Sequence, residues 1–214
     1  MAATDAPVPE LQSRAASCAE RLLHADRVLL ASHIDADGLT SAAVAARALE
    51  RADIPFETVF EKQLDAESVA AIAARDYGTV LFTDFGSGQL DIIAEHEQSG
   101  DFVPIIADHH QPVDAETEFH LNPLLEGIDG ASELSGAGAS YLLARALATH
   151  SSGDERLDNR DLSALAVVGA VGDMQASDGQ LHGANRPIVA EGIGAGVLEE
   201  IKDLAVYGKQ TRPL

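Results

Sequence analysis

The chain has 214 residues, of which 35 are acidic and 14 are basic, so its formal net charge at pH 7 is −21. This excess of negative charge argues against a nucleic-acid-binding domain that works through a simple basic groove. A hydrophobic fraction of 46% excludes a disordered acidic chain, and the length is sufficient for one large α/β domain with its own core.

The N-terminal region has neither a basic leader nor a long apolar run, and no stretch reaches the roughly 18 apolar residues of a membrane span. We therefore expect a soluble, cytoplasmic protein with no membrane partner. Residues 9–24 place their apolar side chains on one stripe, which predicts an amphipathic helix. Cys18 lies on that stripe and is expected to be a small core residue, since a single cysteine excludes an internal disulfide and a thiolate zinc cluster.

Strand-like and helical segments alternate over the next part of the chain. Short apolar runs predict four strands, and the segments between them have helical spacing. This alternation predicts a doubly wound α/β fold, a mainly parallel sheet with right-handed crossovers and helices on both faces. The predicted strands are 27–32, 55–60, 78–84 and 101–108, and the predicted helices are 39–52, 64–76 and 87–98.

From about Gly136 the pattern is helical only. Helices are predicted at 137–150, 162–173 and 194–207, with a polar loop at 151–161. We expect residues 1–208 to form one domain, with its strand-helix core at about 27–135 and its helical part at about 136–208. Residues 209–214 are typical of the start of a linker, which leads us to expect a second domain beyond them.

Carboxylates and imidazoles follow three of the predicted strands. Because ligands gather at the carboxyl ends of parallel strands, we expect these side chains to lie together. Residues two apart in an extended segment share a side, so the three that follow the first strand are expected to face one pocket. The residues are His33, Asp35 and Asp37 after the first strand, Asp84 after the third, and Asp108, His109 and His110 after the fourth.

Asp173 ends a long apolar segment and joins this set. Taken alone, Asp173 is typical of a helix end or a turn. A separate segment, DFG at 84–86, resembles a kinase metal loop, but no glycine-rich phosphate loop accompanies it, which excludes a kinase. Together, carboxylates and imidazoles favour hard or borderline divalent ions such as Mn²⁺ and Mg²⁺, with iron and zinc left open.

Two weaker features have two interpretations each. The backbone N–H groups of residues 135–138, Ser-Gly-Ala-Gly at the start of a predicted helix, either meet a substrate phosphate or belong to a close helix contact. Asn122 before Pro123 either orients a loop of the metal site or is ordinary turn chemistry.

Four segments resemble, in order, motifs I to IV of the DHH phosphoesterase superfamily. The resemblance spans residues from about 27 to 178, and two longer segments, GIDGASELSGAGASYLLARAL and AVVGAVGDMQ, are similar to the RecJ-like single-strand exonucleases. Within that branch the chain resembles the archaeal RecJ homologues known as GINS-associated nucleases. The four motif segments are SHIDADGLTSAA, FTDFGSGQLD, ADHHQP and VGDMQASDG.

The resemblance implies a set of ligands for two Mn²⁺ or Mg²⁺ ions. It assigns His33 and Asp35 to one ion and Asp84 to both, while the second ion takes Asp37, His109 and Asp173. Four carboxylates and two neutral imidazoles carry a formal charge that two divalent cations cancel. The resemblance also implies that His110 contacts the scissile phosphate and that Asp108 orients the neighbouring imidazole.

The implied activity is two-metal hydrolysis of a phosphodiester, with hydroxide as the nucleophile and no covalent enzyme intermediate. The implied substrate is single-stranded DNA or RNA, shortened from one end to 5′-mononucleotides, in DNA repair or replication. Two alternatives stay open. One is a small-molecule or oligonucleotide phosphoesterase or pyrophosphatase of the same superfamily, and the other is a replisome scaffold that binds a GINS-type protein without catalysis.

The chain departs from the family pattern in two respects. RecJ-like enzymes usually carry a second, C-terminal domain that closes over the substrate, and no segment here resembles it. Phosphate binding normally relies on basic residues that release counterions, yet only Lys62, Lys202 and Lys209 are lysines. This acidic, lysine-poor composition is typical of adaptation to molar salt, where the Debye length is about 3 Å, so we interpret the source as a halophilic archaeon.

Overall fold

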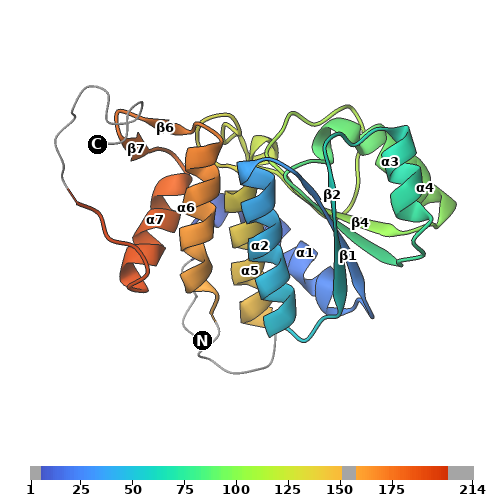
Figure 1. Cartoon of the computed structure of the whole chain (residues 1–214), viewed down its shortest axis with the longest axis horizontal. Helices are drawn as coiled ribbons and strands as arrows, with labels where there is room; N and C mark the ends of the chain where they lie inside the picture. Colours follow the sequence, from blue (N-terminus) through green and yellow to red (C-terminus); the bar gives the residue numbers. More distant parts are fainter. Residues whose placement is uncertain (1–5, 151–157, 202–214) are drawn as a thin grey trace.

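A computed structural model of the chain describes residues 6–150 and 158–201. Within them, five parallel strands form one sheet in the order β2-β1-β3-β4-β5, and a short antiparallel hairpin, β6-β7, lies apart from it (Figure 1). The strands are β1 Val28–His33, β2 Phe56–Glu61, β3 Thr79–Thr83, β4 Val103–Ala107, β5 His120–Leu121, β6 Ala176–Ser177 and β7 Gln180–Leu181.

Helices cover both faces of the sheet, as expected for a doubly wound fold. Helices α1, α2 and α5 pack on one face and α3 and α4 on the other, while α6 packs on α2 and α5, and α7 packs on α6 (Figure 1). The α-helices are α1 Gln12–Leu23, α2 Ala36–Arg51, α3 Ala66–Ala73, α4 Leu90–Ser99, α5 Gly136–His150, α6 Ser163–Gly172 and α7 Asn185–Gly194. Short 3₁₀ turns lie at Pro9–Leu11, Ser87–Gln89, Pro123–Glu126 and Arg160–Leu162.

Strand β1 shows why the sequences of the central strands are unbroken apolar runs. Val28 and Leu30 point into the core under α1, α2 and α5, whereas Leu29 and Ala31 point into the core under α3 and α4. All four side chains are fully buried, and each leucine contributes about 2 kcal/mol from removal of its apolar surface from water. Cys18 is buried in the first of these cores, which confirms its packing role, and burial raises the pKa of its thiol to about 12.

The strand order creates a switch point between β1 and β3. Helix α2 follows β1 over one face of the sheet, and α4 follows β3 over the other face, so the two connections diverge at the carboxyl edge. Open α/β sheets bind their ligands in the crevice at such a point. The residues that meet there are His33 at the end of β1 and Asp84 directly after β3.

The structure differs from the sequence-based expectations at one strand, β5, and at the start of one helix, α2. The sheet has a fifth strand, β5, whose two residues are too few to give a recognisable alternation. Helix α2 begins at Ala36, before the predicted start at residue 39, because Asp35 caps its N-terminus through a hydrogen bond from Gly38 N.

The predicted helix at 194–207 is wrong for residues 195–201, and the rest of it lies outside the described residues. The helix lies earlier, at α7, and ends at Gly194; Gly196, two residues later, has a left-handed φ of 73° that is typical of the residue after a helix cap. The segment of α7 escaped detection because Pro187 and two glycines lower its helix propensity. Most of the predicted polar loop, residues 151–157, also lies outside the described residues. Among the residues that are described, no helix is long and apolar enough to cross a membrane.

Candidate metal centre

The structure brings all eight predicted site residues together at the carboxyl edge of the sheet. Strand β1 ends in His33, Asp84 follows β3, and the Asp108-His109-His110 segment follows β4. Asp35 caps the N-terminus of α2 and Asp37 lies in the first turn of that helix, while Asp173 caps the C-terminus of α6. Side-chain atoms of these residues lie within 4.8 Å of one another in three overlapping groups, whose members are His33, Asp35, Asp37, Asp84, Asp108, His109, His110 and Asp173.

The expectation that His33, Asp35 and Asp37 share one side of an extended segment is wrong, because Asp37 already belongs to α2. Asp35 caps the helix with Oδ1, and its Oδ2 lies 3.0 Å from Nδ1 of His33. Asp37 points elsewhere, and its carboxylate accepts hydrogen bonds from the backbone N–H groups of Gly136 at 2.7 Å and Ala137 at 3.0 Å. The helical turn therefore directs the two aspartates to different sides of the site.

These bonds also decide between the two interpretations of residues 135–138. The N–H groups of Gly136 and Ala137 at the start of α5 are already taken by the buried carboxylate of Asp37. The positive end of the helix dipole thus stabilises a site carboxylate. The contact of α5 with the site favours the close-packing interpretation over a phosphate site.

Asp84 lies at the centre of the cluster and has an unusual backbone conformation. Its φ of 60° is in the left-handed region, which aspartate tolerates better than most residues. The side chain is 1% exposed, and neither carboxylate oxygen has a hydrogen-bond partner among the described residues. Nε2 of His109 lies 3.3 Å from Oδ1 without hydrogen-bond geometry. Burial, together with the nearby charges of Asp37 and Asp108, raises the pKa of Asp84 to about 8.

The two histidines each have one ring nitrogen fixed by a backbone carbonyl. Nδ1 of His109 lies 2.7 Å from the carbonyl oxygen of Gly130, and Nε2 of His33 lies 3.1 Å from that of Lys62. Because a carbonyl only accepts, the N–H sits on those nitrogens, and the opposite nitrogen of each ring faces the carboxylates. This is the arrangement in which an outer hydrogen bond presents a histidine to a metal ion.

The ligand-type atoms form two groups with Asp84 between them. We name His33, Asp35 and Asp84 the first group, and Asp37, His109 and Asp173 the second group. Asp84 also approaches the second group through His109. Without a cation, burial lowers the pKa of His109, but the nearby Asp84 carboxylate, the bond to the Gly130 carbonyl and the charges of Asp108 and Asp37 outweigh this and raise the pKa to about 10.

Asp108 differs from the other carboxylates because its oxygens are occupied. It is fully buried and accepts hydrogen bonds from the backbone N–H groups of Ser87 and His109 and from Nδ1 of His110. Burial alone raises its pKa, but the bond and charge of His110 prevail and hold it well below the usual range. The bond to Asp108 in turn raises the pKa of His110, whose side chain is 55% exposed.

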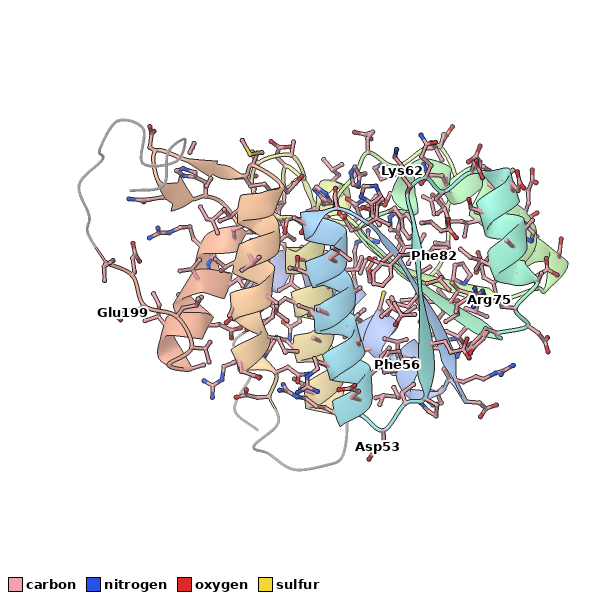
Figure 2. All side chains as sticks on the ribbon, viewed as in Figure 1. Asp53, Phe56, Lys62, Arg75, Phe82 and Glu199 are labelled. Carbon is pink, nitrogen blue, oxygen red and sulfur yellow. The ribbon has the colours of Figure 1, made fainter. Side chains whose placement is uncertain are left out.

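A cleft of about 590 Å³ opens beside this cluster. Its walls include His33, Asp84 and His110 together with loop residues after β2, β3 and β4. Lys62 lines the cleft at the end of β2, at the same edge of the sheet (Figure 2). Three neutral amides line it as well, those of Gln63, Gln89 and Gln111.

Three residues that support the site were missed or left undecided at the sequence level. Asn122 does both things considered for it, since Oδ1 accepts from Leu124 N in a turn while Nδ2 donates to the carbonyl of His110. Gln175 follows Asp173 by two residues in the fourth motif, and that proximity was the only available signal. Gly130 offers no side chain, so its role through a carbonyl had no signal at all.

A family model and several known proteins match the chain. The model of the N-terminal domain of the DHH family matches residues 27–169. An uncharacterized protein of Methanocaldococcus jannaschii is 34% identical over 191 residues, which cover 85% of this chain and 40% of that protein. The chain therefore spans less than half the length of this relative.

Two solved structures of RecJ are similar to the chain, each 26% identical and each covered over 88% of this chain. RecJ from Thermus thermophilus, in complex with Mn²⁺, has a TM-score of 0.67, and the match covers 27% of it. A second exonuclease RecJ, bound to manganese, has a TM-score of 0.69, and the match covers 49% of it. Both relatives hold manganese, and both are much longer than the matched region.

Proposed function

The chain belongs to the DHH family, and on that premise we propose that it is a two-metal hydrolase of phosphodiesters that shortens single-stranded nucleic acid from one end. The observation that carries the proposal is the buried carboxylate of Asp84, whose two oxygens lack hydrogen-bond partners among the described residues. A buried, unpaired carboxylate costs several kcal/mol, so this arrangement favours a cation between the oxygens.

The donor set fits Mn²⁺ or Mg²⁺. The first group, His33, Asp35 and Asp84, would hold one ion, and the second group would hold another with Asp84 shared. Carboxylates and imidazoles without thiolates are the ligands that these ions accept. When bound, such a pair of ions activates water and neutralises charge in an in-line displacement at phosphorus.

His110 and Asp108 supply the protein's own part of the reaction. The Asp108 carboxylate fixes Nδ1–H of His110 at 2.8 Å and favours the charged imidazolium. The opposite edge of the ring is then free to donate a proton or a hydrogen bond to the phosphate in the cleft. Asp108 acts only through His110, because its oxygens are already occupied.

The charges around the cleft support a substrate with more than one phosphate. Among the described residues, each arginine side chain has a hydrogen-bond or ion-pair acceptor, whereas the ammonium group of Lys62 has none. This unpaired cation lines the cleft together with three glutamines. Lys62 would then meet a phosphate next to the scissile one, and the amides would contact sugars and bases. We therefore favour an oligonucleotide over a small phosphate ester.

End-labelled single strands test the proposal. With Mn²⁺ in molar KCl we expect labelled 5′-mononucleotides to appear from one end, and we expect Asp84→Ala to abolish this release. The variant should retain the far-ultraviolet circular dichroism of the parent. Manganese-dependent hydrolysis that survives in Asp84→Ala would refute the site, and hydrolysis of short diesters without strand shortening would favour the small-molecule phosphoesterase.

A further inference from the structure

We propose that Gln175, held by Asn185, is a positioning residue that sets the affinity of the second group for its ion while leaving the first group unaffected. This inference rests on the proposed function, because it concerns the same metal centre. It extends the centre from its ligands to the start of α7, a helix that contributes no ligand.

The side-chain amide of Gln175 links Asp173 and His109, two ligand residues of the second group. Its Nε2 donates to Oδ2 of Asp173 at 2.8 Å and to the carbonyl oxygen of Gly130 at 2.8 Å. The same carbonyl accepts the Nδ1–H of His109 at 2.7 Å. One NH₂ group therefore fixes the Asp173 carboxylate directly and steadies the carbonyl that orients the His109 ring.

Asn185 determines which way the Gln175 amide points. Its Nδ2 donates to Oε1 of Gln175 at 2.7 Å, so the oxygen of that amide is turned toward Asn185 and the NH₂ group toward the ligands. A flipped amide would place an oxygen against the Asp173 carboxylate and the Gly130 carbonyl, which is unfavourable. The direction is anchored further by the backbone, since Asn185 N donates to the carbonyl of Glu133 at 2.8 Å.

Burial makes these bonds effective. Gln175 is 4% exposed and Asn185 is 2% exposed, so water does not replace a lost partner readily. Asp173, by contrast, is a half-buried helix cap whose carboxylate has Gln175 as its hydrogen-bond donor. A carboxylate at the end of a helix, followed by Met174 at a left-handed φ of 61°, needs such a partner to hold one rotamer.

The bonds of this pair stop short of the first group. Within the described part of the chain, no hydrogen bond of Gln175 or Asn185 reaches His33, Asp35 or Asp84. Loss of the amide should therefore lower the affinity for only one ion of the pair. A residue with a merely structural role would lower stability without separating the two ions.

Titration with Mn²⁺, followed by electron paramagnetic resonance of free and bound ion, measures the two affinities without any activity assay. In Gln175→Ala and in the volume-conserving Gln175→Met we expect one of the two binding steps to lose about tenfold to hundredfold in affinity, with the other step unchanged. Gln98→Ala is the matched control, since Gln98 is exposed on α4 and far from the centre. Excess Mn²⁺ should restore the coupled two-ion signal in both Gln175 variants.

A double-mutant cycle tests the role of Asn185. Asn185→Ala should weaken the same step by a smaller factor, and Gln175→Ala combined with Asn185→Ala should match Gln175→Ala alone, because Asn185 acts through Gln175. Equal losses in both steps, or unchanged binding in both Gln175 variants, would overturn the inference. A parent protein that fails to bind two ions would instead refute the proposed function, so the two failures are distinct.

Discussion

A β-carbon built on Gly136 would lie 2.4 Å from Oδ1 of Asp84, so only glycine permits the start of α5 to approach this carboxylate so closely. The same residue donates its backbone N–H to Asp37 at 2.7 Å. One glycine thus sets the positions of two carboxylates that the two ligand groups use.

Substitution of Gly136 should therefore weaken metal binding without removing any ligand. In Gly136→Ala we expect the added methyl group to displace Asp84 and to lower Mn²⁺ affinity at least tenfold, with a loss of about 1–3 kcal/mol in the free energy of unfolding. Calorimetric titration measures the affinity. Gly78→Ala is the control, because a β-carbon there meets no atom within 4 Å. Equal affinities in the two variants would contradict the role given to this close contact.

The metal-free protein should lose stability as the pH rises, and Asp84 should account for much of the loss. Its pKa is about 8 in the folded chain against 3.8 as its ordinary value, so the folded protein binds a proton that the unfolded chain has released. The free energy of unfolding therefore falls with rising pH up to about 8, and His109, with a pKa of about 10, acts in the same direction.

Urea unfolding in chelator at pH 6 and pH 9 measures this effect. We expect the fall between the two pH values to be about 3 kcal/mol smaller in Asp84→Asn than in the parent, because the variant lacks this titration. An identical fall in both proteins would show that Asp84 carries no such proton.

Asp108→Asn should change the pH dependence of the reaction without preventing metal binding. The bond to Asp108 raises the pKa of His110, so its loss makes the imidazolium deprotonate at lower pH. We expect two Mn²⁺ ions still to bind, while the alkaline limb of the pH profile of kcat/KM moves to lower pH. His110→Ala should remove that limb. An unchanged profile in both variants would argue against His110 as the proton or hydrogen-bond donor.

Lys62 should matter only for substrates that carry a second phosphate. In Lys62→Gln we expect KM for an oligonucleotide to rise about threefold to tenfold, the effect of one partly exposed charge contact. KM for bis(p-nitrophenyl) phosphate, which has one phosphate, should not change, and Lys62→Arg should retain most of the affinity. A parallel rise for both substrates would place Lys62 outside substrate recognition.

The sheet and the position of the centre were predictable because both follow from local signals. Apolar runs of five or six residues mark the central strands, and the acidic and histidine residues come directly after them. Parallel strands bring such ends together irrespective of the conformation of the loops. For the same reason Asp84 was identified without knowledge of its left-handed backbone.

The supporting contacts were not predictable, because they join segments far apart in the chain. His109 meets the carbonyl of Gly130 across 21 residues, and Gln175 meets the same atom across 45. The sides of the site that Asp35 and Asp37 face also depend on where α2 begins. A single N-cap hydrogen bond at Asp35 fixes that start. Helix α7 was missed because proline and glycine conceal its pattern.

Anomalous X-ray diffraction from crystals grown with Mn²⁺ is the most direct test of the centre. We expect two manganese peaks per chain, one among His33, Asp35 and Asp84 and the other among Asp37, His109 and Asp173, with an Asp84 oxygen ligating each ion. A protein saturated with Mn²⁺ that shows no peak beside Asp84, or peaks only at exposed surface carboxylates, would contradict it.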